Sequence, residues 1–350
     1  MQAIFAVTVP FFALVLLGWI AARSHVLPAA AIPGLNAYVL FFALPCLLFR
    51  FGASLPPGRL ADPTLIGIYL LAAIVIVGVT LAATLRRAGS ADGVDLRDAA
   101  FGALVAAFPN AGFMGVPLLV ALLGENAAGP VIGAILVDLV VTSTLCISLA
   151  QAHSQRAGRD EPRSPLPAAL ASLRSALTNP LPWAIGLGAA FSAWNLELLA
   201  PVAQIVRMLG DSATPVALFT IGTVLWRAGR HAHTRTPPRH YLPVTLIKLL
   251  LHPALVFAIG SAAMALGAPV SSFGLMVLTL TAALPSASNV SVLAERYGAD
   301  NGRIARIIMA STVAAFATFS LCAWLFQIRA APLSNPGPVL SLCILYTLAT

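Results

Sequence analysis

The chain has 350 residues, of which 59% are hydrophobic and only 9% are charged, and its mean hydropathy is +0.92. Soluble domains carry roughly 25% charged residues, so this composition excludes a soluble globular protein and predicts a polytopic membrane protein. A net charge of +8 would suggest a nucleic-acid partner in a soluble protein. Here the basic residues lie between apolar segments, where they indicate membrane topology instead.

Ten segments have the length and apolar character of a membrane helix, which needs about 20 mostly apolar residues. We therefore expect an all-α membrane protein with ten transmembrane helices. They are predicted at residues 3–22, 34–54, 64–85, 99–123, 129–151, 179–197, 201–226, 241–267, 272–294 and 303–328. The N-terminus has no basic flank and no cleavage site, so residues 1–22 are expected to be a retained helix and not a signal peptide.

Fifteen of the nineteen arginines lie in the connections on one side of this arrangement, and three lie on the other. Cytoplasmic loops of membrane proteins are enriched in Lys and Arg. The arginine-rich side is therefore expected to face the cytoplasm, with both termini outside.

Two of the apolar segments carry a matched sequence that proline interrupts. Residues 106–111 read Ala-Ala-Phe-Pro-Asn-Ala, and residues 282–287, 176 positions later, read Ala-Ala-Leu-Pro-Ser-Ala. Proline removes a backbone donor and clashes with the previous turn, so both helices should break there and cross near the bilayer midplane. Matched breaks in the two halves of a membrane chain are typical of a transporter's binding site. The alternative is a pair of kinked packing helices.

A second internal match supports a division into two halves. Residues 43–55 and 213–225 both read A-x-P-x-x-L-F-x-x-G-x-x-L. We predict two five-helix repeats, at residues 1–151 and 179–328, joined by a cytoplasmic linker at 152–178. Five crossings are an odd number, so the second repeat enters the membrane inverted. The tail at 329–350 is too short to span and is expected to be ill-fixed or a short interfacial helix.

The residues beside the two breaks are the candidate substrate-binding residues. A half-helix that starts after Pro109 or Pro285 would direct its positive end into the membrane, which suits an anion. Amide and hydroxyl groups can bind a carboxylate without the desolvation cost of a buried cation, and glycine permits close backbone approach. The candidates are Pro109, Asn110, Gly112, Pro285, Ser286, Ser288 and Asn289, together with Asn36, which either caps its helix or reaches the site.

Two charged residues lie inside predicted helices. Asp138 is the candidate coupling residue for a proton or sodium ion, because ionisable groups at membrane depth are usually functional. Its alternative role is a packing contact with Thr142 or Ser143. Lys248 either contacts the anion or extends its ammonium to the interface.

Other polar residues are expected to be structural. His252 is predicted to be a satisfied core residue, while Asp211 either stabilises a bend near Pro215 or lines a vestibule. The four cysteines lie in apolar runs and are expected to be core residues. His231 and His233 are expected in a solvated loop and not in a metal site. The usual nucleotide-binding, metalloprotease and hydrolase signatures are absent, so we expect no enzyme, cofactor or metal.

Several of these motifs resemble the auxin efflux carrier family, and bacterial malonate-transporter-like members are the most similar. The residues that carry the resemblance are Asn36 to Tyr38, Ala43 to Pro45, Asn110 to Pro117, Lys248 to Pro253, Leu284 to Ala287 and Ala294 to Gly298. The resemblance covers about residues 1–328. It implies ten helices in two inverted repeats, a scaffold and a transport subdomain, and crossing broken helices 4 and 9 at the substrate site.

The resemblance also implies organic anions as substrates, moved by a secondary or uniport mechanism. The short central loop departs from plant-type carriers, so hormone efflux is not implied. We expect a secondary transporter of small organic anions, with malonate or related dicarboxylates as candidates, alternating access around the two breaks. Its partners would be the lipid bilayer and the anion, without nucleic acid; a homodimer is left open. The alternative is a membrane-embedded sensor or enzyme that uses the same cavity.

Overall fold

The computed structural model describes residues 2–28, 30–56, 58, 62–85, 94–156, 178–231 and 237–326. Within these ranges the regular secondary structure is helical, apart from one isolated β-bridge. Seven helical stretches are long and apolar enough to cross a membrane, which confirms the prediction of a multi-pass helical protein. They are Phe5–Arg23, Ala31–Ser54, Pro63–Leu85, Glu125–Gln151, Ala200–Arg227, Pro238–Ala265 and Asn301–Leu325.

The other three predicted segments are shorter or interrupted. The segment predicted at 179–197 forms α11 (Pro180–Ala193). The segment at 99–123 divides into α6 (Leu96–Ala107), the π-helical turn η2 (Ala111–Gly115) and α7 (Val116–Leu123). The segment at 272–294 divides into α15 (Ser272–Ala282) and α16 (Asn289–Arg296). Both predicted breaks are therefore present, and the count of ten crossings stays a prediction.

Several of the long helices contain a π-helical turn. The helices of the first half are α1 (Gln2–Arg23), α2 (Ala31–Tyr38), η1 (Val39–Ala43), α3 (Leu44–Ser54), α5 (Pro63–Leu85), η3 (Glu125–Ala127), α8 (Ala128–Val137), η4 (Asp138–Thr142) and α9 (Ser143–Arg156). Those of the second half are α12 (Ala200–His231), α13 (Pro238–Leu246), η5 (Ile247–Leu251), α14 (His252–Ala265) and α17 (Asn301–Leu325).

Three of the four π-helical turns end two residues before a proline. The prolines are Pro45 after η1, Pro117 after η2 and Pro253 after η5. A proline ring clashes with the carbonyl of the preceding turn, and a wider turn relieves that clash. The fourth turn, η4, has no proline after it and begins at Asp138 instead.

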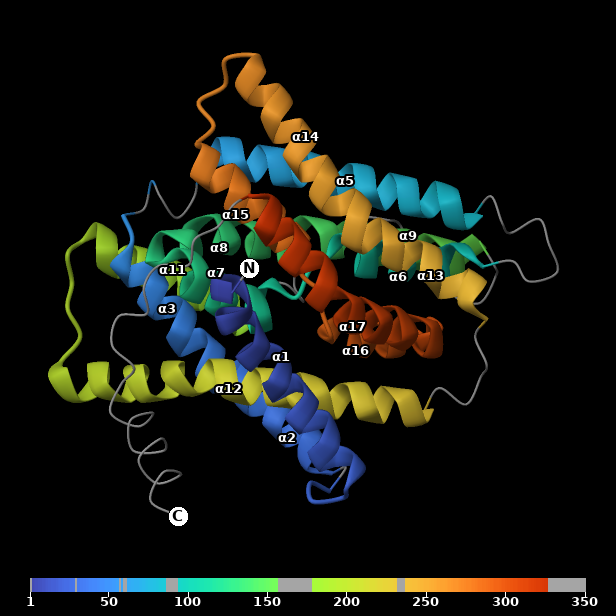
Figure 1. The fold of residues 1–350 in the computed structure, drawn as a ribbon, viewed down its shortest axis with the longest axis horizontal. Coiled ribbons are helices and arrows are strands. Elements are labelled where there is room, and N and C mark those ends of the chain that lie inside the picture. Colours follow the sequence, from blue (N-terminus) through green and yellow to red (C-terminus); the bar gives the residue numbers. More distant parts are fainter. Residues whose placement is uncertain are drawn as a thin grey trace.

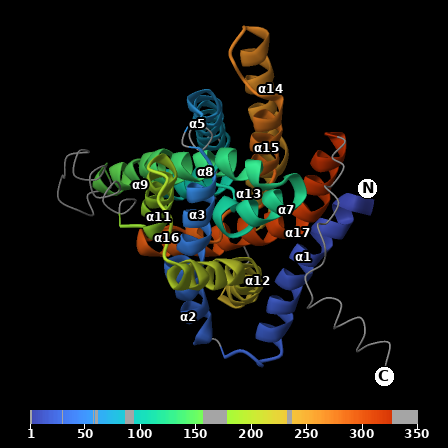
Figure 2. The same ribbon diagram turned by 90° about the vertical axis from the view of Figure 1, so that its left-hand side faces the viewer.

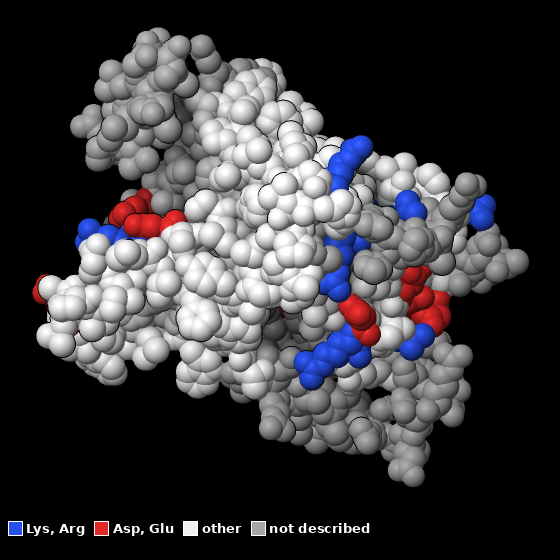
Figure 3. Space-filling view, turned by 90° about the horizontal axis from the view of Figure 1, so that it is seen from below, with Lys and Arg blue, Asp and Glu red and all other residues white. Residues whose placement is uncertain are grey.

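The helix ends that border the predicted arginine-rich connections gather on one side of the molecule. Figure 1 shows the C-terminal ends of α5, α9 and α12 and the N-terminal ends of α6 and α13 together at the right. In Figure 2, α12 lies on the opposite side of the bundle from α5 and α14. Figure 3 shows charged residues near the two ends of the molecule, with a broad uncharged surface between them. This distribution suits a protein whose middle is surrounded by lipid.

Parts of the predicted domain organisation lie outside the described residues. These are residues 157–177 of the linker, His233 in the loop after α12, and the tail from residue 327.

Glycines from the repeated sequence motif lie at the closest helix contacts. Gly222 of α12 lies against the backbone of Val15 in α1, so a Cβ atom there would overlap the Val15 carbonyl. Gly52 of α3, at the matching position of the first half, lies against Ile185 and Gly188 of α11. Small residues let membrane helices approach closely enough for their backbones to pack. The second helix of each half therefore packs against the first helix of the other half.

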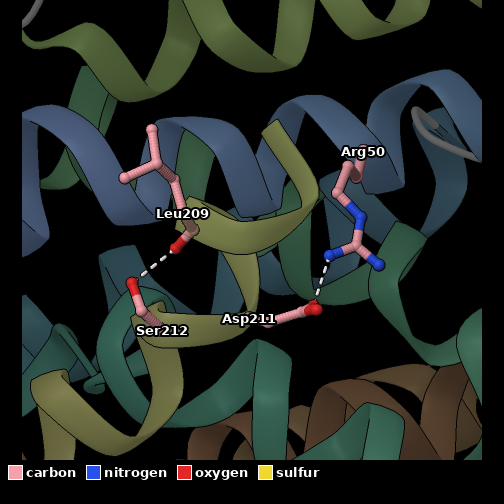
Figure 4. A network of polar contacts seen from close by, with 4 residues as sticks. All are labelled: Arg50, Leu209, Asp211 and Ser212. Carbon is pink, nitrogen blue, oxygen red and sulfur yellow. Dashed lines mark hydrogen bonds and ion pairs between the residues drawn. The ribbon is translucent and has the colours of Figure 1, made fainter. Parts of the chain in front are cut away.

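An ion pair connects α3 with α12 at the end of the molecule that is predicted to face the outside. The Arg50 Nη1 atom lies 2.6 Å from Asp211 Oδ1, and both side chains are exposed (Figure 4). The Ser212 hydroxyl donates to the Leu209 carbonyl and lies 2.7 Å from the Tyr38 hydroxyl. Asp211 lies inside the continuous helix α12 and its side chain points to Arg50, so the ion pair joins two helices, and its predicted role at a bend near Pro215 stays a prediction.

We predict that Gly222→Ala lowers the free energy of unfolding by roughly 1–3 kcal/mol, because the added methyl group forces α1 and α12 apart. The measurement is thermal unfolding of the purified protein in detergent. Gly78→Ala in α5 is the matched control, since a Cβ atom at Gly78 meets no atom within 4 Å. Equal melting temperatures for the two variants would contradict the packing argument.

Candidate functional site

The two proline-broken segments meet and are hydrogen-bonded to each other. The backbone N–H of Asn110 donates to the Pro285 carbonyl over 2.8 Å, and the N–H of Ala287 donates to the Phe108 carbonyl over 3.0 Å. Together they form an antiparallel bridge between Pro109 and Ser286. Each break thus satisfies backbone groups that the other has lost from its helix. Segments 176 residues apart in the sequence are joined at one point.

New helical turns begin on the far side of both breaks. Asn110 precedes η2, and its carbonyl accepts from the N–H groups of Met114 and Gly115. Ser288 precedes α16, which begins at Asn289. The first N–H groups of a helix have no partner within it, and they carry a partial positive charge. Both restarted helices direct this end toward the joined breaks, although the N–H groups of Ala111, Val290 and Ser291 already donate to nearby backbone carbonyls.

Polar side chains at the joined breaks have unused hydrogen-bonding capacity. Asn110 is 3% exposed, and no described residue hydrogen-bonds to its side-chain amide. Among the described residues, the buried Ser286 hydroxyl and the Asn289 Oδ1 atom are also without a partner. Buried polar groups are nearly always paired with protein, water or a ligand. Three unpaired groups at one place therefore indicate a binding site.

Gly112 and Gly115, which both follow the first break, differ in their surroundings. A Cβ atom at Gly115 would meet the Leu284 side chain at 2.7 Å, so Gly115 makes room for the other broken segment. A Cβ atom at Gly112 would meet nothing within 4 Å. Gly112 therefore does not support a close backbone contact, and the prediction that it does is wrong. The open space next to it lies two residues after Asn110.

Asp138 lies fully buried in η4 and is hydrogen-bonded on both carboxylate oxygens. Tyr69 of α5 donates its hydroxyl to Oδ2 over 2.8 Å, and Thr142 donates to Oδ1 over 3.1 Å. Ser143, the other predicted partner, donates instead to the backbone carbonyl of Asp138. Asp138 is thus hydrogen-bonded on both oxygens, as a polar group at membrane depth requires.

Lys248 is fully buried, so the prediction that it extends to the interface is wrong. Its ammonium donates over 2.8 Å to the carbonyl of Ala282, the last residue of α15, and lies 3.1 Å from His252 Nδ1. The last carbonyls of a helix have no partner within it and favour a cation. Lys248 therefore caps the end of α15, three residues before Pro285.

His252 is only partly satisfied, which corrects its interpretation as a satisfied core residue. An ammonium group can only donate, so His252 Nδ1 accepts from Lys248 and the ring hydrogen lies on Nε2. Nε2 is buried and has no partner among the described residues. The ring also packs near Tyr69, with 5.8 Å between centroids. Tyr69, Asp138, Lys248 and His252 form one buried polar cluster that reaches the break through Ala282.

Asn36 lines a cavity beside the restarted helix α16. It is inside α2, which begins at Ala31, so it does not cap the helix as one interpretation required. It lines this cavity, of about 590 Å³, together with Ser291, Glu295 and Asn301. Sequence reasoning did not find this cavity, because its walls come from α2, α12, α16 and α17, which are distant in the chain. The only signal in the sequence was a polar residue in each wall.

Joined helix breaks with unpaired polar groups, inside a multi-pass helical protein, define a membrane transporter. A family described as "Membrane transport protein" matches residues 3–325, nearly the whole chain. The chain belongs to this family, and its predicted resemblance to the auxin efflux carriers is confirmed.

The relatives found in this comparison carry transporter names. A "Putative malonate transporter" of Rhizobium meliloti is 27% identical over 334 residues, which covers 95% of this chain and 98% of that protein. "Auxin efflux carrier component 8" of Arabidopsis thaliana is 21% identical, over 72% of this chain and 79% of that protein. An "Uncharacterized transporter" of Methanothermobacter thermautotrophicus is 26% identical, over 88% and 93%.

We predict that Lys248→Met lowers the free energy of unfolding by about 3 kcal/mol, because it leaves the Asp138 carboxylate buried without its cation. Thermal unfolding in detergent measures the loss. The double variant Asp138→Asn/Lys248→Met should recover part of it, since the uncompensated charge is then absent. A double variant no more stable than the single one would show that the two charges are not coupled.

Proposed function

We propose that the protein is a secondary transporter of small organic anions, with the substrate site at the joined breaks of α6/α7 and α15/α16. The observation that carries the proposal is the hydrogen-bonded contact of the two breaks beside the unpaired groups of Asn110, Ser286 and Asn289. Pro109, Pro285, Gly112 and Ser288 shape this site. A carboxylate oxygen would accept from the amides and the hydroxyls, close to the positive ends of η2 and α16.

The proposed architecture is ten transmembrane helices in two inverted repeats, at residues 1–151 and 179–328. The reciprocal packing of the motif glycines supports it. Gly52 brings the second helix of the first half against α11, and Gly222 brings the second helix of the second half against α1. An inverted repeat exchanges equivalent contacts in this way. The arginine bias places both termini outside a bacterial inner membrane.

The proposed substrate is a small dicarboxylate such as malonate. The name of the relative from Rhizobium meliloti supports this class, at 27% identity. The site offers uncharged donors and helix N-termini in place of a cation, which suits an anion that must be released on the other side. The membrane sensor or enzyme alternative requires binding without exchange. Counterflow of labelled malonate in proteoliposomes distinguishes it from a transporter.

The buried polar cluster is the proposed coupling element. Asp138 interacts with Lys248, and Lys248 holds the end of α15 just before its break. A proton or sodium ion bound at Asp138 would weaken the attraction on Lys248 and so change the support of the break. Inward movement of an anion opposes an inside-negative potential by about 2.3 kcal/mol per charge per 100 mV. An importer of a dianion therefore needs a coupled cation.

We predict that Asn110→Ala and Asn289→Ala each weaken malonate binding about tenfold, because each removes a hydrogen bond to a charged group. The folded fraction should stay unchanged, since water replaces the lost groups in the free protein. Isothermal titration in detergent measures the affinity. Gln204→Ala, at an exposed position of α12, is the control amide. Wild-type affinity in both asparagine variants would refute the site.

We predict that Asp138→Asn abolishes the dependence of uptake on a proton or sodium gradient more strongly than it reduces binding. The amide has the size of the carboxylate but no charge for a cation. The measurement is uptake into proteoliposomes with imposed pH or sodium gradients, for the wild type and the variant. If the wild type has no gradient dependence, or the variant keeps all of it, Asp138 has a structural role.

A further inference from the structure

The cavity of about 590 Å³ that contains Asn36 lies beside the restarted half-helix α16. Ser291 lines the cavity and is two residues after Asn289, an axial distance of about 3 Å along the helix. The cavity therefore reaches to within one helical turn of the proposed substrate site. Its volume is that of a small-molecule pocket, which is typically about 300–1,000 Å³.

Two charged residues line this cavity, and they come from different helices. Arg227 belongs to the C-terminal end of α12, and Glu295 belongs to α16. Both side chains are exposed, and neither has an ion pair or side-chain hydrogen bond to any described residue. Asn301, at the start of α17, adds an Oδ1 atom that is buried without a partner in the described part of the chain. The remaining lining is largely apolar.

This arrangement is suited to a carboxylate. The guanidinium of Arg227 matches the two oxygens of a carboxylate. Because no described residue pairs with Arg227, an anion need not displace one. The side-chain amides of Asn36 and Asn301 can complete the hydrogen bonds, while the Ser291 hydroxyl already donates to the Ser288 carbonyl. Glu295 would repel the same anion and so weaken its retention, which favours passage over trapping.

We propose that this cavity is a second anion-binding site, on the cytoplasmic route to the breaks, in which Arg227 recognises a carboxylate. The proposal rests on the proposed function for the identity of the anion. Its cytoplasmic position rests on the arginine bias, since the cavity lies at the ends of α12 and α16 that border arginine-rich connections. Arg227 is thereby a specificity-determining residue that lies outside the joined breaks.

The test compares three variants by whether each raises or lowers the half-saturation concentration of malonate in transport. Arg227→Gln should raise the half-saturation concentration of malonate about fivefold in inverted vesicles, where the cytoplasmic face is accessible, and leave it unchanged in right-side-out vesicles. Glu295→Gln should lower it about twofold in inverted vesicles, because a like charge is removed. Arg296→Gln is the matched control: it is exposed on α16 but does not line the cavity.

The opposite directions of the two expected effects on the half-saturation concentration distinguish an anion-binding site from a salt-bridge gate between α12 and α16. If Arg227 and Glu295 served only to pair with each other in another conformation, both variants would change transport in the same direction, which overturns the proposal. The vesicles contain only phosphatidylcholine. An Arg227→Gln effect that appears only after addition of an anionic lipid would show that the cavity binds a lipid headgroup, and it would also overturn the proposal.

Calorimetric titration of malonate into the detergent-purified variants keeps this proposal distinguishable from the transport proposal. Binding that Arg227→Gln weakens and Glu295→Gln strengthens, without counterflow, supports the second site and refutes transport. Counterflow that neither variant changes refutes the second site and leaves transport supported. A wild-type protein that neither binds nor exchanges malonate, succinate or another dicarboxylate of this size overturns both.

Discussion

The contact between the two helix breaks is the constraint on which the rest of the structure depends. A backbone N–H or C=O that leaves its helix inside a membrane must find another partner, because lipid offers none. The pairs Asn110–Pro285 and Ala287–Phe108 provide that partner across the two halves. Neither break could stay at this depth without the other. The same contact leaves side chains, and not the backbone, available to a ligand.

The surrounding polar groups are arranged to support the breaks. Lys248 binds the last carbonyl of α15, and Asp138 balances its charge. Removing either one leaves the other as a buried charge without its counterion, which is far less favourable than removing both. Because these residues support the end of α15, the coupling role proposed for Asp138 is compatible with a role in stabilising the fold.

Two kinds of helix contact are compared among the described residues, and they differ in how much relative movement of the helices they permit. The α1–α12 and α3–α11 contacts are made at Gly222 and Gly52, with backbones close together and shape-matched. Such contacts resist sliding. The wall between α12 and α16 is instead a cavity with unpaired charges. Movement during alternating access would meet least resistance there, because no well-packed surface has to separate.

The sequence by itself determined the membrane class, most of the helices and both breaks. Hydropathy is a local property, and Pro109 and Pro285 interrupt a helix wherever they occur, so no tertiary information was needed. The matched motifs also indicated which positions correspond between the halves. The motif did not determine the role of each of its residues. A close contact was predicted at Gly112, but the structure has it at Gly115.

Only the tertiary structure decided how buried polar residues are paired. The position of Lys248 in its helix is equally compatible with the interface and the core, and the choice depends on Ala282, 34 residues away, and on Asp138. The cavity at Arg227 likewise arises from helices in both halves. Charge pairing and cavity shape are set by segments that are distant in the chain, and a local pattern of residues carries no information about which distant segment will lie opposite.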